Sequence, residues 1–226
     1  MTPMSDPKNI AAVPCQIYLL TPPVIEDMDA FCAALKSALS GGHVSVLQIR
    51  LKDLDDSALI QAANAIYPIC NAAGVSVIMN DRPDIAAKIG AEGAHIGQDD
   101  MDYFSSRDVL GGDAILGVTC HNSKELAFQA ASSGADYVAF GAFFETSTKS
   151  PKSRAELEIL SWWQEAVEIP SVAIGGITTE NAAQVIEAGA DFIAVCAGVW
   201  DYKDGPEAAL KQLSKLCLEH SQAYRF

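Results

Sequence analysis

The chain has 226 residues, half of them apolar, and a formal net charge of −14. This charge argues against a nucleic-acid partner, because phosphate contacts along a nucleic acid need clustered Lys and Arg. No apolar run approaches the roughly 20 residues of a membrane-spanning helix, and the start lacks the basic segment and apolar core of a secretory signal. We therefore expect a cytoplasmic protein that acts on small molecules and binds neither nucleic acid nor membrane. The sequence leaves the oligomeric state open, a homo-oligomer included.

The first 14 residues are polar and rich in Pro and Ala, and we expect a flexible leader at 1–14. From there one pattern repeats: a short apolar run, a polar turn, and an Ala-rich helical segment that ends near Gly. The expected strands are 16–20, 44–50, 75–80, 94–97, 114–118, 136–140, 171–174 and 191–196.

The segments between these strands carry helix start and stop signals. Pro83 suits a first helical position and Gly90 a helix end. Asn122 resembles the first residue of a capping box, and Thr178 or Thr179 is expected to cap the helix after the seventh strand. Expected helices are 26–40, 56–73, 83–90, 122–133, 154–166, 179–188 and 206–219, with a short turn at 199–202.

Eight strands alternate with helices, and the strands are continuously apolar, as expected when both faces of a parallel sheet are buried. This pattern predicts an α/β fold with a single (β/α)8 TIM barrel, one catalytic domain over 15–226. A doubly wound sheet is the alternative, but no GxGxxG follows the first strand.

Two acids, Asp81 and Asp100, follow the third and fourth strands. Neighbouring parallel strands finish at one edge, so the two carboxylates are expected to face one point. Mg²⁺ typically takes one or two protein carboxylates and completes its shell with water and substrate phosphate. The competing interpretation is that Asp81 caps the next helix and that Asp100 is a solvated loop acid.

Cations and hydrogen-bonding groups follow other strands. Gln48, Arg50 and Lys52 alternate at the end of the second strand, and Lys149 follows the hydroxyl residues 146–148 in a long loop after the sixth. Such groups suit a polyanion, with Lys149 as a point charge on phosphate, although a solvated strand exit and a Ser/Thr-rich loop are the alternatives.

Small residues follow the last two strands, at Gly175-Gly176 and Cys196-Ala197-Gly198. Loops at these two positions of a barrel often bind phosphate through backbone N–H groups, so Gly176 and Ala197 are candidates for a second phosphate site. His121 is a weak catalytic candidate. The whole set indicates displacement of a phosphate-bearing leaving group, with metal and cations stabilising the developing charge.

Together these motifs resemble the thiamine phosphate synthase (thiamine-phosphate pyrophosphorylase) family over roughly residues 16–200. The motifs that carry the resemblance are Gln48-x-Arg50-x-Lys52, Asn80-Asp81, His95-x-Gly97-Gln98-x-Asp100, Gly117-Val118-x-x-His121, Thr146-x-Thr148-Lys149 and Ile174-Gly175-Gly176-Ile177.

The resemblance implies a Mg²⁺-dependent enzyme that joins 4-amino-2-methyl-5-hydroxymethylpyrimidine diphosphate to a thiazole phosphate, giving thiamine phosphate and pyrophosphate. It implies Mg²⁺ on Asp81 and Asp100. It implies the pyrimidine diphosphate on Gln48, Arg50, Lys52, Asn80, Thr119 and Lys149, with Arg50, Lys52 and Lys149 catalytic. It implies the thiazole phosphate on Thr146, Thr148, Gly176, Cys196 and Ala197.

Three positions depart from the family pattern: Thr119 and Ala197 stand where Ser is usual, and Glu145 where Pro is frequent. Two other functions remain open. A thiazole tautomerase on the same barrel would need His121 as acid/base and would leave the metal and diphosphate residues unexplained. A non-catalytic phosphate-binding barrel would bind ligand without turnover.

Overall fold

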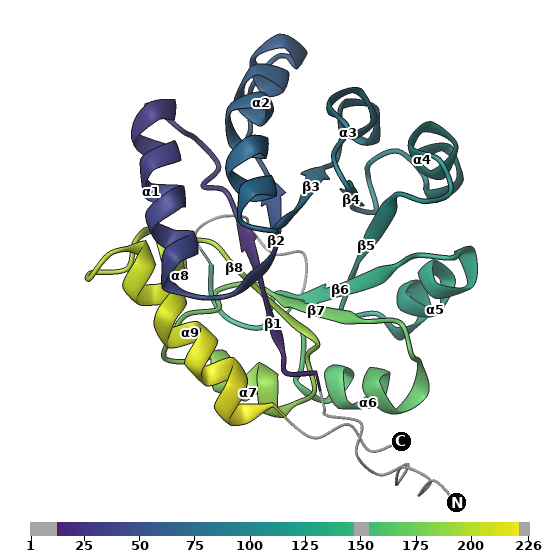
Figure 1. The fold of residues 1–226 in the computed structure, drawn as a ribbon. Coiled ribbons are helices and arrows are strands. Elements are labelled where there is room, and N and C mark those ends of the chain that lie inside the picture. Colours follow the sequence, from purple (N-terminus) through teal and green to yellow (C-terminus); the bar gives the residue numbers. More distant parts are fainter. Residues whose placement is uncertain (1–12, 147–153, 222–226) are drawn as a thin grey trace, which may run out of the picture.

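The computed structural model describes residues 13–146 and 154–221, in which eight parallel strands close into a barrel. Each strand pairs with the next in sequence, and the last pairs with the first. Helices surround the barrel on the outside (Figure 1). The strands are β1 (Gln16–Leu20), β2 (Val44–Ile49), β3 (Ser76–Asn80), β4 (Gly93–Ile96), β5 (Ile115–His121), β6 (Tyr137–Gly141), β7 (Ser171–Ile174) and β8 (Phe192–Val195).

The expected (β/α)8 fold is thus confirmed. The helices are α1 (Met28–Gly41), α2 (Asp56–Ala72), α3 (Pro83–Ile89), α4 (Tyr103–Leu110), α5 (Lys124–Ser133), α6 (Glu158–Ala166), α7 (Ala182–Glu187), α8 (Ala197–Trp200) and α9 (Pro206–His220). Residues 1–12 of the expected leader lie outside the described residues, and the division into leader and catalytic domain stays a prediction. In the described part of the chain, no helix has the length and apolar character to cross a membrane.

One helix was missed, and two local predictions were wrong. Helix α4 was not expected, because it turns few apolar side chains inward; its signal was Asp102, whose carboxylate accepts from the N–H groups of Phe104 and Ser105. Helix α5 is capped by Ser123 and not by Asn122. Helix α7 starts three residues later than expected, and no Thr side chain caps it.

Acidic side chains hold the amino ends of the strands in register. An acid stands directly before each of β4, β6 and β8, and its carboxylate accepts from a backbone N–H of the preceding strand. The pairs are Glu92 with Val77 at 2.7 Å, Asp136 with Leu116 at 2.8 Å, and Asp191 with Ser171 at 2.7 Å. Two of these acids end Gly-Ala-Asp segments, at 134–136 and 189–191, and the contacts give a structural reason for this repeat. The carboxyl ends of the strands are left to form a site.

The core has two layers. The larger one lies between the strands and the surrounding helices and includes the fully buried Trp163. The smaller one fills the inside of the barrel with side chains from β1, β6, β7 and β8: Tyr18, Leu20, Tyr137, Ala139, Val172 and Ala194. Two of these are tyrosines, so the interior contains polar groups that must be paired.

Candidate active site

A cavity of about 270 Å³ opens at the carboxyl ends of the strands, where the active sites of TIM barrels lie. All eight strands or the loops directly after them contribute to its lining. The lining residues are Leu20, Gln48, Arg50, Asn80, Asp81, His95, Gly97, Asp100, Thr119, His121, Gly141, Ala142, Glu145, Thr146, Ile174, Gly175, Gly176, Ile177, Thr178, Ala194, Cys196, Ala197 and Gly198.

Ten of the residues expected in the site line this one cavity: Gln48, Arg50, Asn80, Asp81, Asp100, Thr119, Thr146, Gly176, Cys196 and Ala197. Lys52 does not line it. Its side chain is exposed, because β2 ends at Ile49 and the strand alternation that would align Lys52 with Arg50 does not continue. Thr148 and Lys149 lie outside the described residues.

The backbone holds both acids in place at the cavity. Asp81 has a φ of 60°, and its N–H donates to the His95 carbonyl oxygen at 2.8 Å. The N-terminal cap position of α3 falls to Arg82 and not to Asp81. The Asp100 carboxylate accepts from the Gly97 N–H at 2.7 Å, and a Cβ at Gly97 would lie only 2.9 Å from it.

Two carboxylates on one cavity fit a hard divalent cation that takes its other ligands from water and substrate. Within residues 13–146 and 154–221, no group of three or more His, Cys, Asp and Glu side chains is arranged to hold a metal. A soft, fully protein-ligated site such as structural zinc is therefore not what these residues provide.

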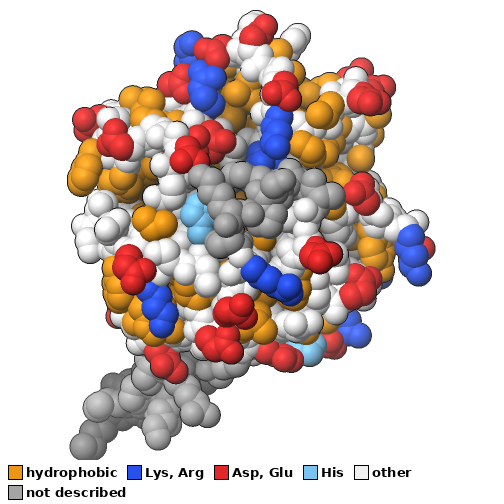
Figure 2. All heavy atoms as spheres, turned by 180° about the vertical axis from the view of Figure 1, so that it is seen from behind, with side chains coloured by type: hydrophobic (Ala, Val, Ile, Leu, Met, Phe, Trp, Pro, Cys, Tyr) orange, Lys and Arg blue, Asp and Glu red, His pale blue; other side chains and the backbone are white. Residues whose placement is uncertain are grey.

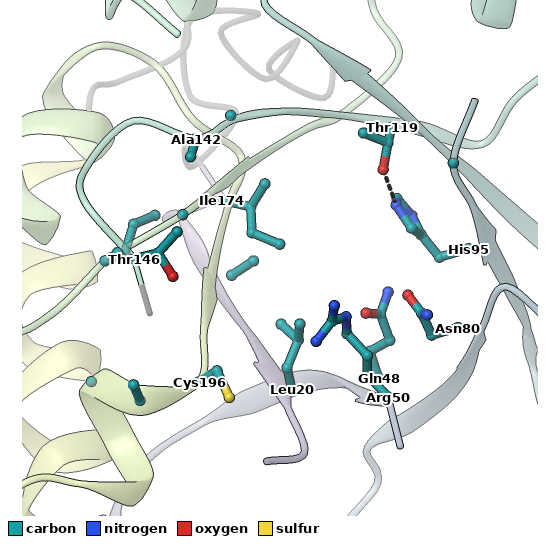
Figure 3. A pocket seen from close by; sticks show the side chains of 18 of the residues that line it. Leu20, Gln48, Arg50, Asn80, His95, Thr119, Ala142, Thr146, Ile174 and Cys196 are labelled. Carbon is teal, nitrogen blue, oxygen red and sulfur yellow. Dashed lines mark hydrogen bonds between the residues drawn. The ribbon is translucent and has the colours of Figure 1, made fainter. Parts of the chain in front are cut away.

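Arg50 carries a polar atom that lacks a partner. Its Nη1 is buried and makes no hydrogen bond within the part of the chain that the structure describes, although its backbone N–H donates to Thr21 Oγ1 at 2.9 Å. Its side chain lies beside Gln48 and Asn80 in the cavity (Figure 3). A buried guanidinium nitrogen without an acceptor is costly, and an anionic ligand would supply the acceptor.

The opposite side of the cavity is built from glycines and small residues. Gly176 has a φ of 66°, and a Cβ there would lie 2.1 Å from the Glu145 carbonyl oxygen. A Cβ at Gly198 would lie 2.5 Å from the Ile177 carbonyl oxygen. The loops after β6, β7 and β8 therefore pack backbone against backbone.

Cys196 belongs to this side of the cavity, and its Sγ lies 3.4 Å from the Thr21 carbonyl oxygen. Burial raises the pKa of its thiol to about 11, against the opposing effect of Arg50. The thiol is therefore protonated at neutral pH and is no nucleophile.

A chain of hydrogen bonds inside the barrel was not anticipated. Gln48 Nε2 donates to Tyr18 Oη at 3.0 Å, and Tyr18 Oη lies 2.8 Å from Tyr137 Oη. Tyr137 Oη lies 2.9 Å from His95 Nδ1, and His95 Nε2 lies 2.7 Å from Thr119 Oγ1. The dashed line in Figure 3 marks the last of these bonds. In the sequence, His95 stands out only as part of the motif His95-x-Gly97-Gln98-x-Asp100, and neither tyrosine was singled out.

One sequence signal could have indicated this chain of hydrogen bonds. Gly117 lies inside β5, where glycine has no propensity advantage, and a Cβ there would lie 1.9 Å from the Tyr137 ring. His121 and Glu145, the first a weak candidate and the second noted as a departure, also line the cavity.

Charged side chains of both signs are scattered over the face of the molecule shown in Figure 2, among the residues that the structure describes.

Comparison with known proteins gives a consistent result. Residues 17–199 match the family described as thiamine monophosphate synthase. A thiamine-phosphate synthase of Rhodospirillum centenum is 52% identical over 202 residues, which are 89% of this chain and 97% of that protein. One of Hyphomonas neptunium is 48% identical, over 89% of this chain and 93% of that protein.

Among solved structures, thiamine phosphate pyrophosphorylase from Pyrococcus furiosus superposes with a TM-score of 0.79 at 29% identity, covering 90% of this chain and 96% of that one. Orotidine 5'-phosphate decarboxylase from Pyrococcus horikoshii superposes with a TM-score of 0.65 at 15% identity, covering 89% of this chain and 99% of that one, which shows a shared fold only.

Proposed function

The chain belongs to the thiamine monophosphate synthase family of transferases, and we propose that it condenses 4-amino-2-methyl-5-hydroxymethylpyrimidine diphosphate with 4-methyl-5-(2-phosphoethyl)thiazole. The products are thiamine phosphate and pyrophosphate. A carboxylated thiazole is a second form that the site could accept. The cytoplasmic location expected from the sequence stays a prediction.

The observation that carries the proposal is the buried, unpartnered Nη1 of Arg50 in the same cavity as Asp81 and Asp100. A diphosphate supplies the acceptor that this nitrogen lacks and the oxygen ligands that a cation between two carboxylates requires. A thiazole tautomerase would use neither feature.

The proposed reaction is a dissociative displacement. The bond between the pyrimidine methylene carbon and the diphosphate oxygen breaks first, and pyrophosphate leaves with the electron pair. The thiazole nitrogen then donates its lone pair to the pyrimidine-methyl cation. No strong general base is required. The polar side chains that line the cavity are one guanidinium, two amides, three hydroxyls, three carboxylates, two imidazoles and the Cys196 thiol.

Arg50 is proposed to stabilise the negative charge that develops on the departing pyrophosphate, together with Lys52 and Lys149. Mg²⁺, when held by Asp81 and Asp100, would neutralise the same charge. Gln48, Asn80 and Thr119 are proposed to orient the pyrimidine diphosphate with neutral hydrogen bonds.

The thiazole phosphate is assigned to the opposite side of the cavity. Gly176, Cys196 and Ala197 would bind it through backbone groups, and Thr146 and Thr148 through hydroxyls. Because Ala197 has no hydroxyl where the family usually has Ser, the contact at this position is assigned to its backbone N–H, at the start of α8.

The test is to incubate both substrates with Mg²⁺ and to measure pyrophosphate and thiamine phosphate together. Equal amounts of the two products are expected, and none of either when EDTA replaces Mg²⁺. Absence of product under conditions in which a relative of established activity works would overturn the proposal. Substrate binding without turnover would identify a phosphate-binding barrel, and thiazole isomerisation without condensation would identify a tautomerase.

A further inference from the structure

The polar side chains inside the barrel form one uninterrupted chain that joins two sides of the cavity. It begins at Gln48 on β2, passes through Tyr18, Tyr137 and His95, and ends at Thr119 on β5. The first and last residues line the cavity, whereas both tyrosines are buried below it. Every link is between 2.7 and 3.0 Å.

The side chains that form these hydrogen bonds also pack against one another. The Tyr137 ring stacks on His95, with centroids 5.5 Å apart and an interplanar angle of 19°, and it lies 5.9 Å from the Tyr18 ring. Gly117 makes room for it, because a Cβ there would overlap the ring. Neither tyrosine can rotate away without opening a void in the barrel interior.

The donors and acceptors along the chain run in one direction. Burial raises the pKa of the hydroxyls of Tyr18 and Tyr137, so both keep their single proton. Tyr18 accepts from Gln48 Nε2 and must donate to Tyr137, and Tyr137 must donate to His95 Nδ1. His95 then carries its proton on Nε2 and donates to Thr119 Oγ1.

We propose that Tyr18, Tyr137 and His95 are positioning residues that fix Gln48 as a hydrogen-bond acceptor, and Thr119 as a hydrogen-bond donor, toward the cavity. One N–H of the Gln48 amide is held inside the barrel, and its oxygen, which accepts no hydrogen bond from the described residues, is assigned to the ligand. The Thr119 oxygen accepts inside the barrel, which leaves its hydroxyl proton for the ligand.

The consequence is a selection among pyrimidines, and it rests on the proposed function. An exocyclic amino group donates to the Gln48 oxygen. In the analogue with an oxo group at the same carbon, a carbonyl oxygen would face the Gln48 oxygen without a hydrogen between them. A site with fixed hydrogen-bond polarity rejects such an analogue, since its own groups remain unpaired.

The experiment measures kcat/KM for the amino pyrimidine diphosphate and for its oxo analogue, in the wild type and in Tyr18→Phe and Tyr137→Phe. Each substitution keeps the ring and removes one hydroxyl, and with it two of the four hydrogen bonds, so the Gln48 amide can rotate and exchange the positions of its oxygen and nitrogen. The wild type should prefer the amino compound by about a hundredfold or more. Either variant should lower this preference about tenfold, and the double variant should lower it no further.

Tyr67→Phe is the matched control, because the Tyr67 hydroxyl donates to Glu92 at 2.9 Å outside the cavity and its loss should leave the preference unchanged. Melting curves identify any variant that does not fold. If one tyrosine variant does not fold, the preference measured in the other tests the inference.

If the folded tyrosine variants keep the preference for the amino compound within twofold of wild type, the tyrosines serve only to pack the barrel interior. This result would overturn the inference. If the wild type forms no thiamine phosphate, the proposed function fails separately. The ratio of the dissociation constants of the two pyrimidine diphosphates, measured by calorimetry in the same variants, then tests the inference.

Discussion

The Asp100 carboxylate accepts a hydrogen bond from the backbone N–H of Gly97 over 2.7 Å, within the turn that follows β4. This bond fixes the direction of an otherwise exposed acid. A Cβ at Gly97 would lie 2.9 Å from the carboxylate, so a side chain there would shift it. A backbone-held carboxylate beside the cavity loses little entropy when it binds a cation.

Asp100→Ala should lower turnover a hundredfold or more, corresponding to about 2.7–4 kcal/mol of lost transition-state stabilisation. The physical reason is the loss of one of two carboxylates available to Mg²⁺. Steady-state rates over a Mg²⁺ titration check it, with Asp113→Ala as control because this exposed acid lies outside the cavity lining. A near-normal rate for Asp100→Ala at ordinary Mg²⁺ concentrations would mean that the metal is held elsewhere.

Arg50→Met should separate stability from ligand binding. Removing a buried nitrogen without a partner should raise the unfolding free energy of the ligand-free protein by about 1–3 kcal/mol. In a domain of this size each kcal/mol raises the melting temperature by about 2–4 °C. The further stabilisation that pyrophosphate and Mg²⁺ give the wild type should disappear.

Thermal melting with and without pyrophosphate checks this prediction. Lys211→Met, which removes an exposed charge from α9, is the control for the change in net charge. A ligand-free Arg50→Met protein that melts below wild type would show that the guanidinium is satisfied in solution.

Much of the fold could be predicted because local and global patterns agree. Continuously apolar strands and Ala-rich helices that end near Gly both indicate the same barrel. Helix α4 was missed because Ser106 is its only fully buried residue, so its sequence carries little of the apolar periodicity on which prediction depends.

The site was predictable only where its residues follow strand ends. Arg50, Asp81 and Asp100 could be placed from their position in the chain, since all parallel strands end at one face. The tyrosine pair could not, because a buried hydroxyl is satisfied by partners from distant strands: Tyr18 and Tyr137 are 119 residues apart in sequence. Lys52 lies three residues past the end of β2, so strand alternation alone does not place it.

Gly176→Ala should lower the free energy of unfolding by more than the left-handed backbone conformation alone explains. Gly90 has nearly the same φ, 67° against 66°, but a Cβ at Gly90 would meet nothing within 4 Å. Gly90→Ala should therefore cost about 1–2 kcal/mol for the left-handed conformation only. Gly176→Ala adds a clash with the Glu145 carbonyl oxygen and should also raise the KM for the thiazole phosphate. Denaturant unfolding and steady-state kinetics check both effects, and equal costs at the two positions would refute the close packing.

Asp191 should make the protein less stable as the pH rises. Burial raises the pKa of its carboxyl in the folded state, against the weaker opposing effect of hydrogen bonds from Ser171. The stabilisation that this carboxyl gives the folded state is therefore fully present below the unfolded pKa of about 3.9, and it is lost as the pH rises through the folded pKa.

Asp191→Asn keeps an oxygen for the Ser171 N–H and removes the charge. The unfolding free energy of this variant, relative to wild type, should therefore increase from pH 4 upward and then level off. Unfolding free energies from pH 4 to 8 check this, with Asp113→Asn as an exposed control. A difference between variant and wild type that stays constant with pH would show that the buried acid does not titrate differently on folding.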